Sequence, residues 1–216
     1  STRFPGKPLV DIGGKPMIQR VYEQACLANL QQVLVATDDA RIADAVQAFG
    51  GQVVLTGADH QSGTDRCFEA YTRHNVPYDC IINIQGDEPF IQPEQINLVI
   101  RCFDNPSTQL ATLIKQIDQP TELFNPNAPK VITDSRQQAI YFSRHPIPYY
   151  RGAEPERWLQ HHTYYKHIGI YGYRADILEQ ITRLPPSSLG LAESLEQLRW
   201  LENGFRIMTA ITTQEN

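Results

Sequence analysis

The stretch CIINIQGDEP (residues 80–89) decides how this chain folds and where its chemistry is expected. It begins with a run of mostly apolar, isoleucine-rich residues, which predicts a strand buried on both faces. It then passes straight into Gln85, Gly86, Asp87 and Glu88, and ends on a proline that cannot take part in regular strand pairing. A polar end on a buried strand is typical of open α/β sheets, in which ligands bind beyond the carboxyl ends of the strands.

Two further strands and four helices are expected in the first hundred or so residues. β-branched runs predict strands at 32–37 and 52–56, and apolar residues at helical spacing predict helices at 15–29, 38–51, 64–74 and 93–103. Strands and helices therefore alternate with short connections, which favours a mostly parallel, doubly wound α/β sheet with helices on both faces. The G-x-G-x-x-G fingerprint of dinucleotide-binding proteins does not occur in the sequence.

The second half of the chain is richer in strands. The pattern predicts strands at 110–115, 130–134, 139–143, 167–174 and 205–212, and helices at 175–181 and 194–204. A loop with three prolines occupies residues 144–158. Because no repeat, low-complexity tract or linker interrupts the chain, residues 1–216 are expected to form one domain with a β-rich elaboration in its second half.

The composition limits the partners that the protein can have. Its 216 residues carry 20% charged side chains and a net charge of −5, which argues against nucleic acid or an anionic membrane as the main partner. No run of about eighteen apolar residues occurs, so no membrane span is expected. The four cysteines form no C-x-x-C pair and each lies in an apolar stretch, so we expect buried, reduced thiols and a cytoplasmic protein.

Polar residues follow each of the three strands predicted in the first half. Asp38 follows the first, the loop 57–66 follows the second, and Asp87 follows the third. The carboxylate of Asp87 could hold Mg²⁺ that takes its other ligands from phosphate and water; the alternative is an aspartate that caps a turn. The loop could contact a base or a phosphate, or merely cap the next helix. Three polar ends on one sheet edge favour a shared site.

The opening segment STRFPGKPL (residues 1–9) carries two cations, Arg3 and Lys7. A guanidinium binds polyphosphate with a planar fork of donors, and an ammonium binds it as a compact charge. The segment is not a Walker A loop, because Lys7 is followed by proline rather than by serine or threonine. A polyphosphate site is one hypothesis for this segment, and a basic amino-terminal tail is the other.

Eight segments together resemble the 3-deoxy-manno-octulosonate cytidylyltransferases, or CMP-Kdo synthetases. In chain order they are STRFPGKPLVDIGGKPMI, ATDD, GADHQSGTDR, NIQGDEPFI, FNPNAPKV, YFSRHPIPY, KHIGIYGYR and SLEQLRWLENG, and they span nearly the whole sequence. The lysine loop recurs across sugar nucleotidyltransferases. The combination of HQSGTDR, QGDEP and HIGIYGY is much more specific.

The resemblance implies a Rossmann-like α/β fold, a homodimer, and Mg²⁺ as cofactor. It also implies transfer of the cytidylyl group of CTP to 3-deoxy-manno-octulosonate (Kdo), which gives CMP-Kdo and pyrophosphate for lipopolysaccharide synthesis. The family has a strand ahead of the opening loop, and a later segment similar to GVDTPEDL whose aspartate joins the metal site. We expect both to be missing from residues 1–216.

Three groups of site residues are expected. Catalysis is assigned to Arg3, Lys7, Gln85 and Asp87, with Mg²⁺ on Asp87. The resemblance assigns the nucleotide to Ser1, Ala36, Thr37, Asp38, Ser62, Gly63 and Arg66. The acid sugar is expected against Arg144, His167, Tyr171, Glu196 and Gln197, with Arg144 and His167 as candidate cations for its carboxylate.

Other interpretations of these residues remain open. Arg144 could form a surface ion pair, Tyr171 could be a core aromatic, and Glu196 could lie on a solvated helix face. Two other functions also fit: a cytidylyltransferase for another acid sugar, of the CMP-sialate type, and a non-catalytic nucleotide-binding module. The charged groups at Arg3, Lys7 and Asp87 favour an enzyme over the non-catalytic module, because a protein that no longer catalyses a reaction can readily lose its charge-neutralising side chains.

Overall fold

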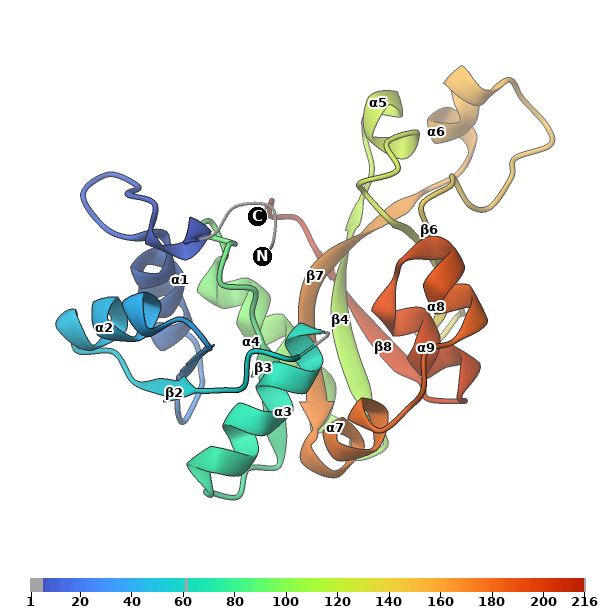
Figure 1. The fold of residues 1–216 in the computed structure, drawn as a ribbon. Coiled ribbons are helices and arrows are strands. Elements are labelled where there is room, and N and C mark those ends of the chain that lie inside the picture. The colour runs from blue at the N-terminus through green and yellow to red at the C-terminus, as the bar shows by residue number, and fades with distance from the viewer. Residues whose placement is uncertain (1–5, 61, 216) are drawn as a thin grey trace.

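The computed structural model describes residues 6–60 and 62–215 (Figure 1). Its first half alternates helices and strands, as expected. After a short 3₁₀ turn at Lys7–Leu9 come α1 (Met17–Cys26), β1 (Val35–Thr37), α2 (Ala40–Ala48), β2 (Val53–Leu55), α3 (Gly63–His74), β3 (Cys80–Asn83) and α4 (Pro93–Arg101).

The second half contains the remaining strands, with helices between them. Its elements are β4 (Leu110–Gln116), α5 (Pro120–Leu123), β5 (Lys130–Thr133), β6 (Ala139–Ser143), α6 (Trp158–His161), β7 (Tyr165–Arg174), α7 (Ala175–Thr182), α8 (Ser188–Glu193), α9 (Glu196–Glu202) and β8 (Ile207–Thr212). All the strands predicted in this half are present, whereas α5, α6 and α8 were not predicted.

Helix starts in the first half follow from capping residues. Asp39 accepts a hydrogen bond from the Arg41 amide at the start of α2, and Ser62 accepts one from the Asp65 amide at the start of α3. Each bond satisfies an amide that the helix itself leaves unpaired. Pro93 occupies the first turn of α4, where a missing amide hydrogen costs nothing. These caps fix where each helix begins relative to the strand before it.

The α/β class is confirmed, but the sheet is less parallel than expected. β1 and β2 pair in parallel, and so do β4 and β8. The larger sheet has the order β6-β5-β7-β4-β8, with β3 also on β7, and its other pairings are antiparallel. The prediction of a mostly parallel sheet is therefore wrong for this part. The five residues between β5 and β6 are too few for a crossover, which allows only an antiparallel pair.

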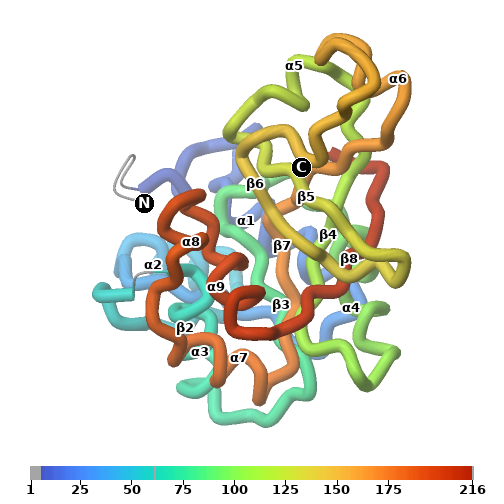
Figure 2. Tube along the Cα trace, turned by 90° about the vertical axis from the view of Figure 1, so that its right-hand side faces the viewer, coloured from blue at the N-terminus to red at the C-terminus, as the bar shows by residue number. Residues whose placement is uncertain are grey.

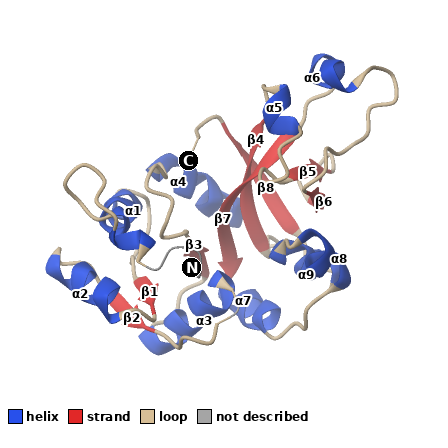
Figure 3. Ribbon diagram, turned by 45° about the horizontal axis from the view of Figure 1, so that its top comes forward, coloured by secondary structure: helices blue, strands red, loops and turns tan. Residues whose placement is uncertain are grey.

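The larger sheet is covered by helices on both faces (Figure 3). Alternate residues of β4 point to opposite sides: Leu110 and Ile114 pack with α7 and α9, and Ala111 and Leu113 pack with α4. Trp200 and Leu198 of α9 are completely buried against the first face. This sandwich holds the long strand β7 rigidly in the middle of the molecule.

An aromatic lobe lies beyond one end of the sheet, where α5 and α6 sit together (Figure 2). Phe124 and Trp158 have ring centroids 6.0 Å apart, and Tyr149 meets Trp158 edge-on at 5.1 Å. Trp158 is buried, whereas Tyr149 is 74% exposed. The lobe therefore has its own small core and an exposed aromatic surface.

None of the helices in the described ranges is long and apolar enough to cross a membrane.

Candidate functional site

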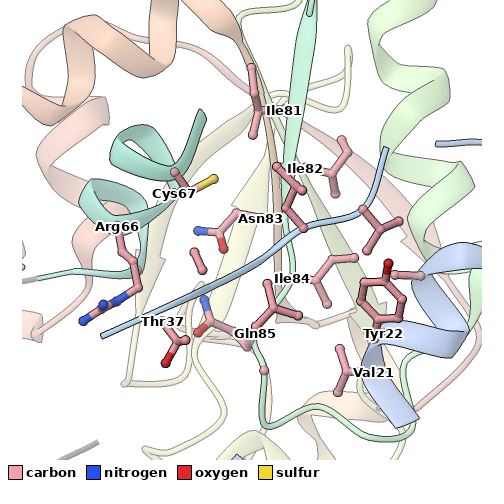
Figure 4. Close-up of a pocket in the computed structure, with 18 of the residues that line it drawn as sticks. Val21, Tyr22, Thr37, Arg66, Cys67, Ile81, Ile82, Asn83, Ile84 and Gln85 are labelled. Atoms are coloured by element: carbon pink, nitrogen blue, oxygen red, sulfur yellow. The ribbon is translucent and has the colours of Figure 1, made fainter. Parts of the chain in front are cut away.

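A cavity of about 1110 Å³ lies among the elements of the first half (Figure 4). Its polar part is at the carboxyl ends of β1 and β3, where the strand ends were expected to meet. Eight of the expected site residues line it: Lys7, Ala36, Thr37, Asp38, Gly63, Arg66, Gln85 and Asp87. The expected nucleotide and phosphate groups therefore converge on one cavity.

The other part of the cavity is apolar and lies between β1 and β3. Residues 33–36 and 80–82 line it together with Val21 and Tyr22 of α1. Within the described ranges, β1 pairs only with β2 and β3 pairs only with β7. We assign only the polar part of the cavity to substrate, because a triphosphate does not suit apolar walls.

Lys7 and Asp87 form the charged mouth of the cavity. Lys7 Nζ lies 2.7 Å from Asp87 Oδ2, although the residues are 80 positions apart in the chain. Their side chains are 40% and 43% exposed, so both groups remain accessible to a ligand. An ammonium and a carboxylate side by side can receive a phosphate and a divalent cation, respectively.

Arg66 of α3 is held in place on the nucleotide side. Its Nη1 donates to Thr56 Oγ1 at 2.6 Å and to the Gly57 carbonyl at 3.2 Å. The same nitrogen lies 3.2 Å from Asp38 Oδ1. Because these contacts come from the loops that follow β1 and β2, Arg66 ties the two strand ends together. The guanidinium is thus fixed at the edge of the cavity instead of moving freely in solvent.

The start of α3 lies beside the end of β3. A Cβ atom added to Gly63 would lie 3.5 Å from Gln85 Nε2 and 3.8 Å from Asn83 Nδ2. The preceding Ser62 is the N-cap, and its hydroxyl also donates to Asp65 Oδ2 at 2.9 Å. Amide groups at a helix start carry partial positive charge, which suits an anionic ligand. Ser62, Gly63 and Gln85 are therefore brought together as expected.

Glu196 links the second half of the chain to α3. It is the first residue of α9 and accepts hydrogen bonds from Thr64 Oγ1 and Arg199 Nη2, each at 3.0 Å. Burial raises the pKa of the Glu196 carboxyl, and hydrogen bonds from Ser62 and Thr64 oppose this shift. Glu196 is thus not on a solvated helix face, and that alternative is wrong.

Tyr171 and Gln197 are buried with unsatisfied polar atoms. Neither Tyr171 Oη nor Gln197 Nε2 has a hydrogen-bond partner within the described ranges. The Tyr171 ring lies 5.1 Å from the His167 ring and 5.0 Å from the Trp200 ring, so it is also a core aromatic. An unpaired buried polar atom destabilises a fold by about 1–3 kcal/mol. These atoms are therefore candidates for contact with a polar ligand.

His167 lies on the same face of β7 as Tyr171, as the alternation predicted. Burial lowers the pKa of its imidazole to about 4, so the ring is neutral at physiological pH. The ring without ligand therefore does not favour the role of a cation, and contact of His167 with the sugar carboxylate stays a prediction. A neutral imidazole can still donate or accept one hydrogen bond to a sugar hydroxyl.

Arg144 has contacts that hold the fold together. Its Nε donates to the Glu193 carbonyl at 2.6 Å, Nη1 to the Pro126 carbonyl at 2.9 Å and Nη2 to the Ser194 carbonyl at 3.1 Å. It thereby joins the end of α8 to the loop before β5. Since the guanidinium already serves three carbonyl groups, its contact with a sugar carboxylate stays a prediction.

Two expected residues, Ser1 and Arg3, lie outside the described residues. Three residues that were not assigned a role make contacts at or next to the site. Thr64 holds Glu196, Thr112 contacts His167 Nε2 at 2.9 Å, and Asn83 Nδ2 donates to Tyr173 Oη at 3.5 Å. Asn83 had a signal in the sequence, since an amide in a strand of isoleucines needs a polar partner.

Asp87 is the carboxylate that best fits a metal ion at the mouth. The part of the chain that is described contains no group of three or more histidine, cysteine, aspartate or glutamate side chains placed to hold one ion. This fits Mg²⁺, which commonly binds through one or two carboxylates and completes its shell with phosphate oxygens and water. It does not fit a structural zinc site, which is closed by four protein ligands.

The fold and the cavity define a nucleotide-binding α/β protein whose ligand site lies at the carboxyl ends of its strands. The sequence profile described as cytidylyltransferase matches residues 1–207. The chain belongs to this family, within the group of 3-deoxy-manno-octulosonate cytidylyltransferases.

The matches to individual relatives cover all or nearly all of this chain. The 3-deoxy-manno-octulosonate cytidylyltransferase of Parabacteroides distasonis is 60% identical over 219 residues, which cover 100% of this chain and 87% of the relative. That of Escherichia coli is 49% identical over 97% of this chain and 82% of the relative. A solved structure of CMP:2-keto-3-deoxy-manno-octonic acid synthetase complexed with CTP has a TM-score of 0.91 and 46% identity, and the match covers 99% of this chain and 86% of that one.

Proposed function

We propose that this protein transfers the cytidylyl group of CTP to Kdo, releasing pyrophosphate and supplying CMP-Kdo for lipopolysaccharide synthesis. The observation that carries the proposal is the Lys7–Asp87 pair at the mouth of a cavity that Thr37 and Arg66 also line. This arrangement suits a nucleoside triphosphate, with the base toward Arg66 and the phosphates toward Lys7. The names of the relatives supply the identity of the base and the sugar.

The reaction needs positioning and charge neutralisation more than covalent help from the protein. A sugar hydroxyl loses its proton to water and attacks the α-phosphorus, the bond from that phosphorus to the bridging oxygen breaks, and pyrophosphate leaves with the electron pair. Lys7 offsets negative charge on the phosphates as it builds up on the leaving group. Asp87 would hold Mg²⁺, which when bound polarises phosphoryl oxygens.

The acid sugar is placed where β7 and α9, from the second half of the chain, meet the start of α3. The unpaired Tyr171 Oη and Gln197 Nε2 would gain hydrogen-bond partners from sugar hydroxyls. Gln85, at the end of β3, would reach the attacking hydroxyl. Asn83, opposite Tyr171, is the last β3 residue in the antiparallel β3–β7 ladder, so the chain leaves β3 in the direction of His167.

We further propose that the protein is a homodimer and that it works in the cytoplasm. The exposed Tyr149 and the partly exposed Phe124 of the aromatic lobe support a contact with a second copy, since exposed aromatic groups are typical of interface cores. All four cysteines are free thiols, as a reducing compartment requires. Cys26 is exposed and Cys67, Cys80 and Cys102 are only half-buried, so the expectation that all four are buried is wrong.

The test is release of pyrophosphate from CTP and Mg²⁺, with Kdo and N-acetylneuraminate offered in parallel. Release with Kdo alone is the expected result, and EDTA should abolish it. Release with N-acetylneuraminate alone would replace Kdo by another acid sugar. CTP binding without release for either sugar would support a nucleotide-binding module and overturn the proposal.

A further inference from the structure

We propose that Thr112 is a positioning residue that fixes the tautomer of His167, so that Nδ1 is left as a hydrogen-bond acceptor for a hydroxyl of the acid sugar. The assignment of the tautomer concerns the His167 ring alone, whereas the contact of Nδ1 with the sugar rests on the proposed function. His167 would then recognise the sugar as an acceptor, and not as the cation that its residue type suggests.

An irregularity in the sheet brings Thr112 under the His167 ring. Along the β4–β7 ladder Thr112 is paired with Tyr171, but its neighbour Leu113 is paired with Ile168. One step on β4 therefore corresponds to three steps on β7, and the extra residues bulge out. The bulge turns the carbonyl groups of Ile168 and Ile170 toward the Thr112 side chain.

The hydrogen bonds of Thr112 determine where the imidazole proton must lie. Thr112 Oγ1 is 2.7 Å from the Ile170 carbonyl oxygen, 3.3 Å from the Ile168 carbonyl oxygen and 2.9 Å from His167 Nε2. A hydroxyl has one proton, and a carbonyl oxygen can only accept. The proton of Thr112 is used on the carbonyl side, so Nε2 of His167 must be the donor to Oγ1.

The consequence for Nδ1 follows from the neutral state of the ring. Phe142 and Tyr171 flank the imidazole, with ring centroids at 5.3 and 5.1 Å, and this burial keeps it uncharged. A neutral imidazole has one N–H group, which Thr112 already engages at Nε2. Nδ1 is then an acceptor, and among the described residues it has no hydrogen-bond partner.

The chain offers a matched set of variants. Thr112→Val removes the hydroxyl with little change in shape, and Thr112→Ser retains it. Thr209 on β8 is paired with Thr112, and Thr209→Val makes the same change there. The Thr209 hydroxyl donates to the Gln137 carbonyl and does not touch His167. The backbone amide of Thr209 keeps its own bond to the same carbonyl, so this control should fold normally.

The first experiment is ¹⁵N–¹H correlation of the histidine rings without substrate, with His167 assigned by its loss in His167→Gln. We expect the Nε2–H tautomer in the wild type, in Thr112→Ser and in Thr209→Val, and a mixture or the Nδ1–H tautomer in Thr112→Val. An Nδ1–H tautomer in the wild type, or an unchanged tautomer in Thr112→Val, would overturn the assignment. If Thr112→Val does not fold, the wild-type and Thr112→Ser spectra still decide.

The second experiment measures kinetics with CTP and Kdo. Thr112→Val should raise KM for Kdo about tenfold, the effect of one neutral hydrogen bond, and leave KM for CTP within about twofold. Thr112→Ser should restore the wild-type KM. Equal changes in both KM values would show a general structural role and contradict the proposal. The expected tautomer together with no turnover would refute the proposed function and leave the positioning of His167 intact.

Discussion

Replacing Asp87 by asparagine should separate the chemistry of the site from the stability of the fold. Asp87 and its partner Lys7 are 43% and 40% exposed. An exposed ion pair contributes about 0–1 kcal/mol to stability, because water screens it and two long side chains must be ordered. For a domain of this size 1 kcal/mol corresponds to about 2–4 °C in Tm, so the variant should melt within about 4 °C of the wild type.

Turnover should respond very differently. Asparagine keeps the size of the side chain and one acceptor oxygen, but it removes the negative charge that attracts Mg²⁺. It also breaks the ion pair with Lys7. Loss of one charge-stabilising group at a reacting phosphate should lower kcat/KM by about 10²–10³-fold or more. A coupled assay of pyrophosphate release, run over a series of Mg²⁺ concentrations, measures this.

Glu94→Gln is the matched control for the Asp87 variant. It breaks another exposed ion pair, between Glu94 and Arg101 of α4, whose side chains are 54% and 51% exposed. Tm should again change little, and turnover should stay at the wild-type level. Wild-type rates in Asp87→Asn would refute the metal assignment. A drop of more than 10 °C in its Tm would refute the argument from exposure.

Three further predictions concern the histidine, the nucleotide pocket and α9. Burial lowers the pKa of His167 from 6.5 to about 4, so between these values the folded state binds fewer protons than the unfolded state and the free energy of unfolding falls on acidification. In urea titrations at pH 7 and pH 4, His167→Gln should lose less of this free energy than the wild type, by up to roughly 3 kcal/mol. Equal losses in the two proteins would contradict this prediction. Arg66→Met should weaken CTP binding about 10- to 100-fold by calorimetry, and unchanged affinity would remove Arg66 from the pocket. Glu196→Gln should raise KM for Kdo more than KM for CTP. A larger increase in KM for CTP would indicate that Glu196 contacts the nucleotide and not the sugar.

Much of the fold could be predicted because its signals are local. Asp39 and Pro93 lie where capping chemistry requires them, so the helices that they begin could be located from the sequence. Polar residues that follow the predicted strands also predicted that Asp38 and Asp87 would share a site, and both line the cavity. That inference needed only the rule that parallel strands present their carboxyl ends at one edge.

The rest depends on long-range geometry that residue patterns do not contain. The direction of the β3–β7 pair joins segments about ninety residues apart, and hydrophobic alternation is the same for either direction. Thr112 matters only because a bulge turns two carbonyl groups toward it. The helix α8 has the sequence SLGLAE, whose glycine and short length give little helical signal. The contacts of Arg144 with three carbonyl groups likewise follow from tertiary packing.

The antiparallel half of the fold has a mechanistic consequence. In-line attack requires the sugar hydroxyl and the α-phosphorus to be held in one geometry, and small misplacements cost orders of magnitude in rate. In the proposed arrangement β3 serves both substrates. The segment after β3 brings Gln85 and Asp87 to the cavity, and the β3 backbone is hydrogen-bonded to β7 beside Tyr171. Thr64 and Glu196 make a second link, from the start of α3 to α9. The proposed spacing between nucleotide and sugar would therefore be set by a sheet ladder and a half-buried hydrogen bond, which are more rigid supports than loops.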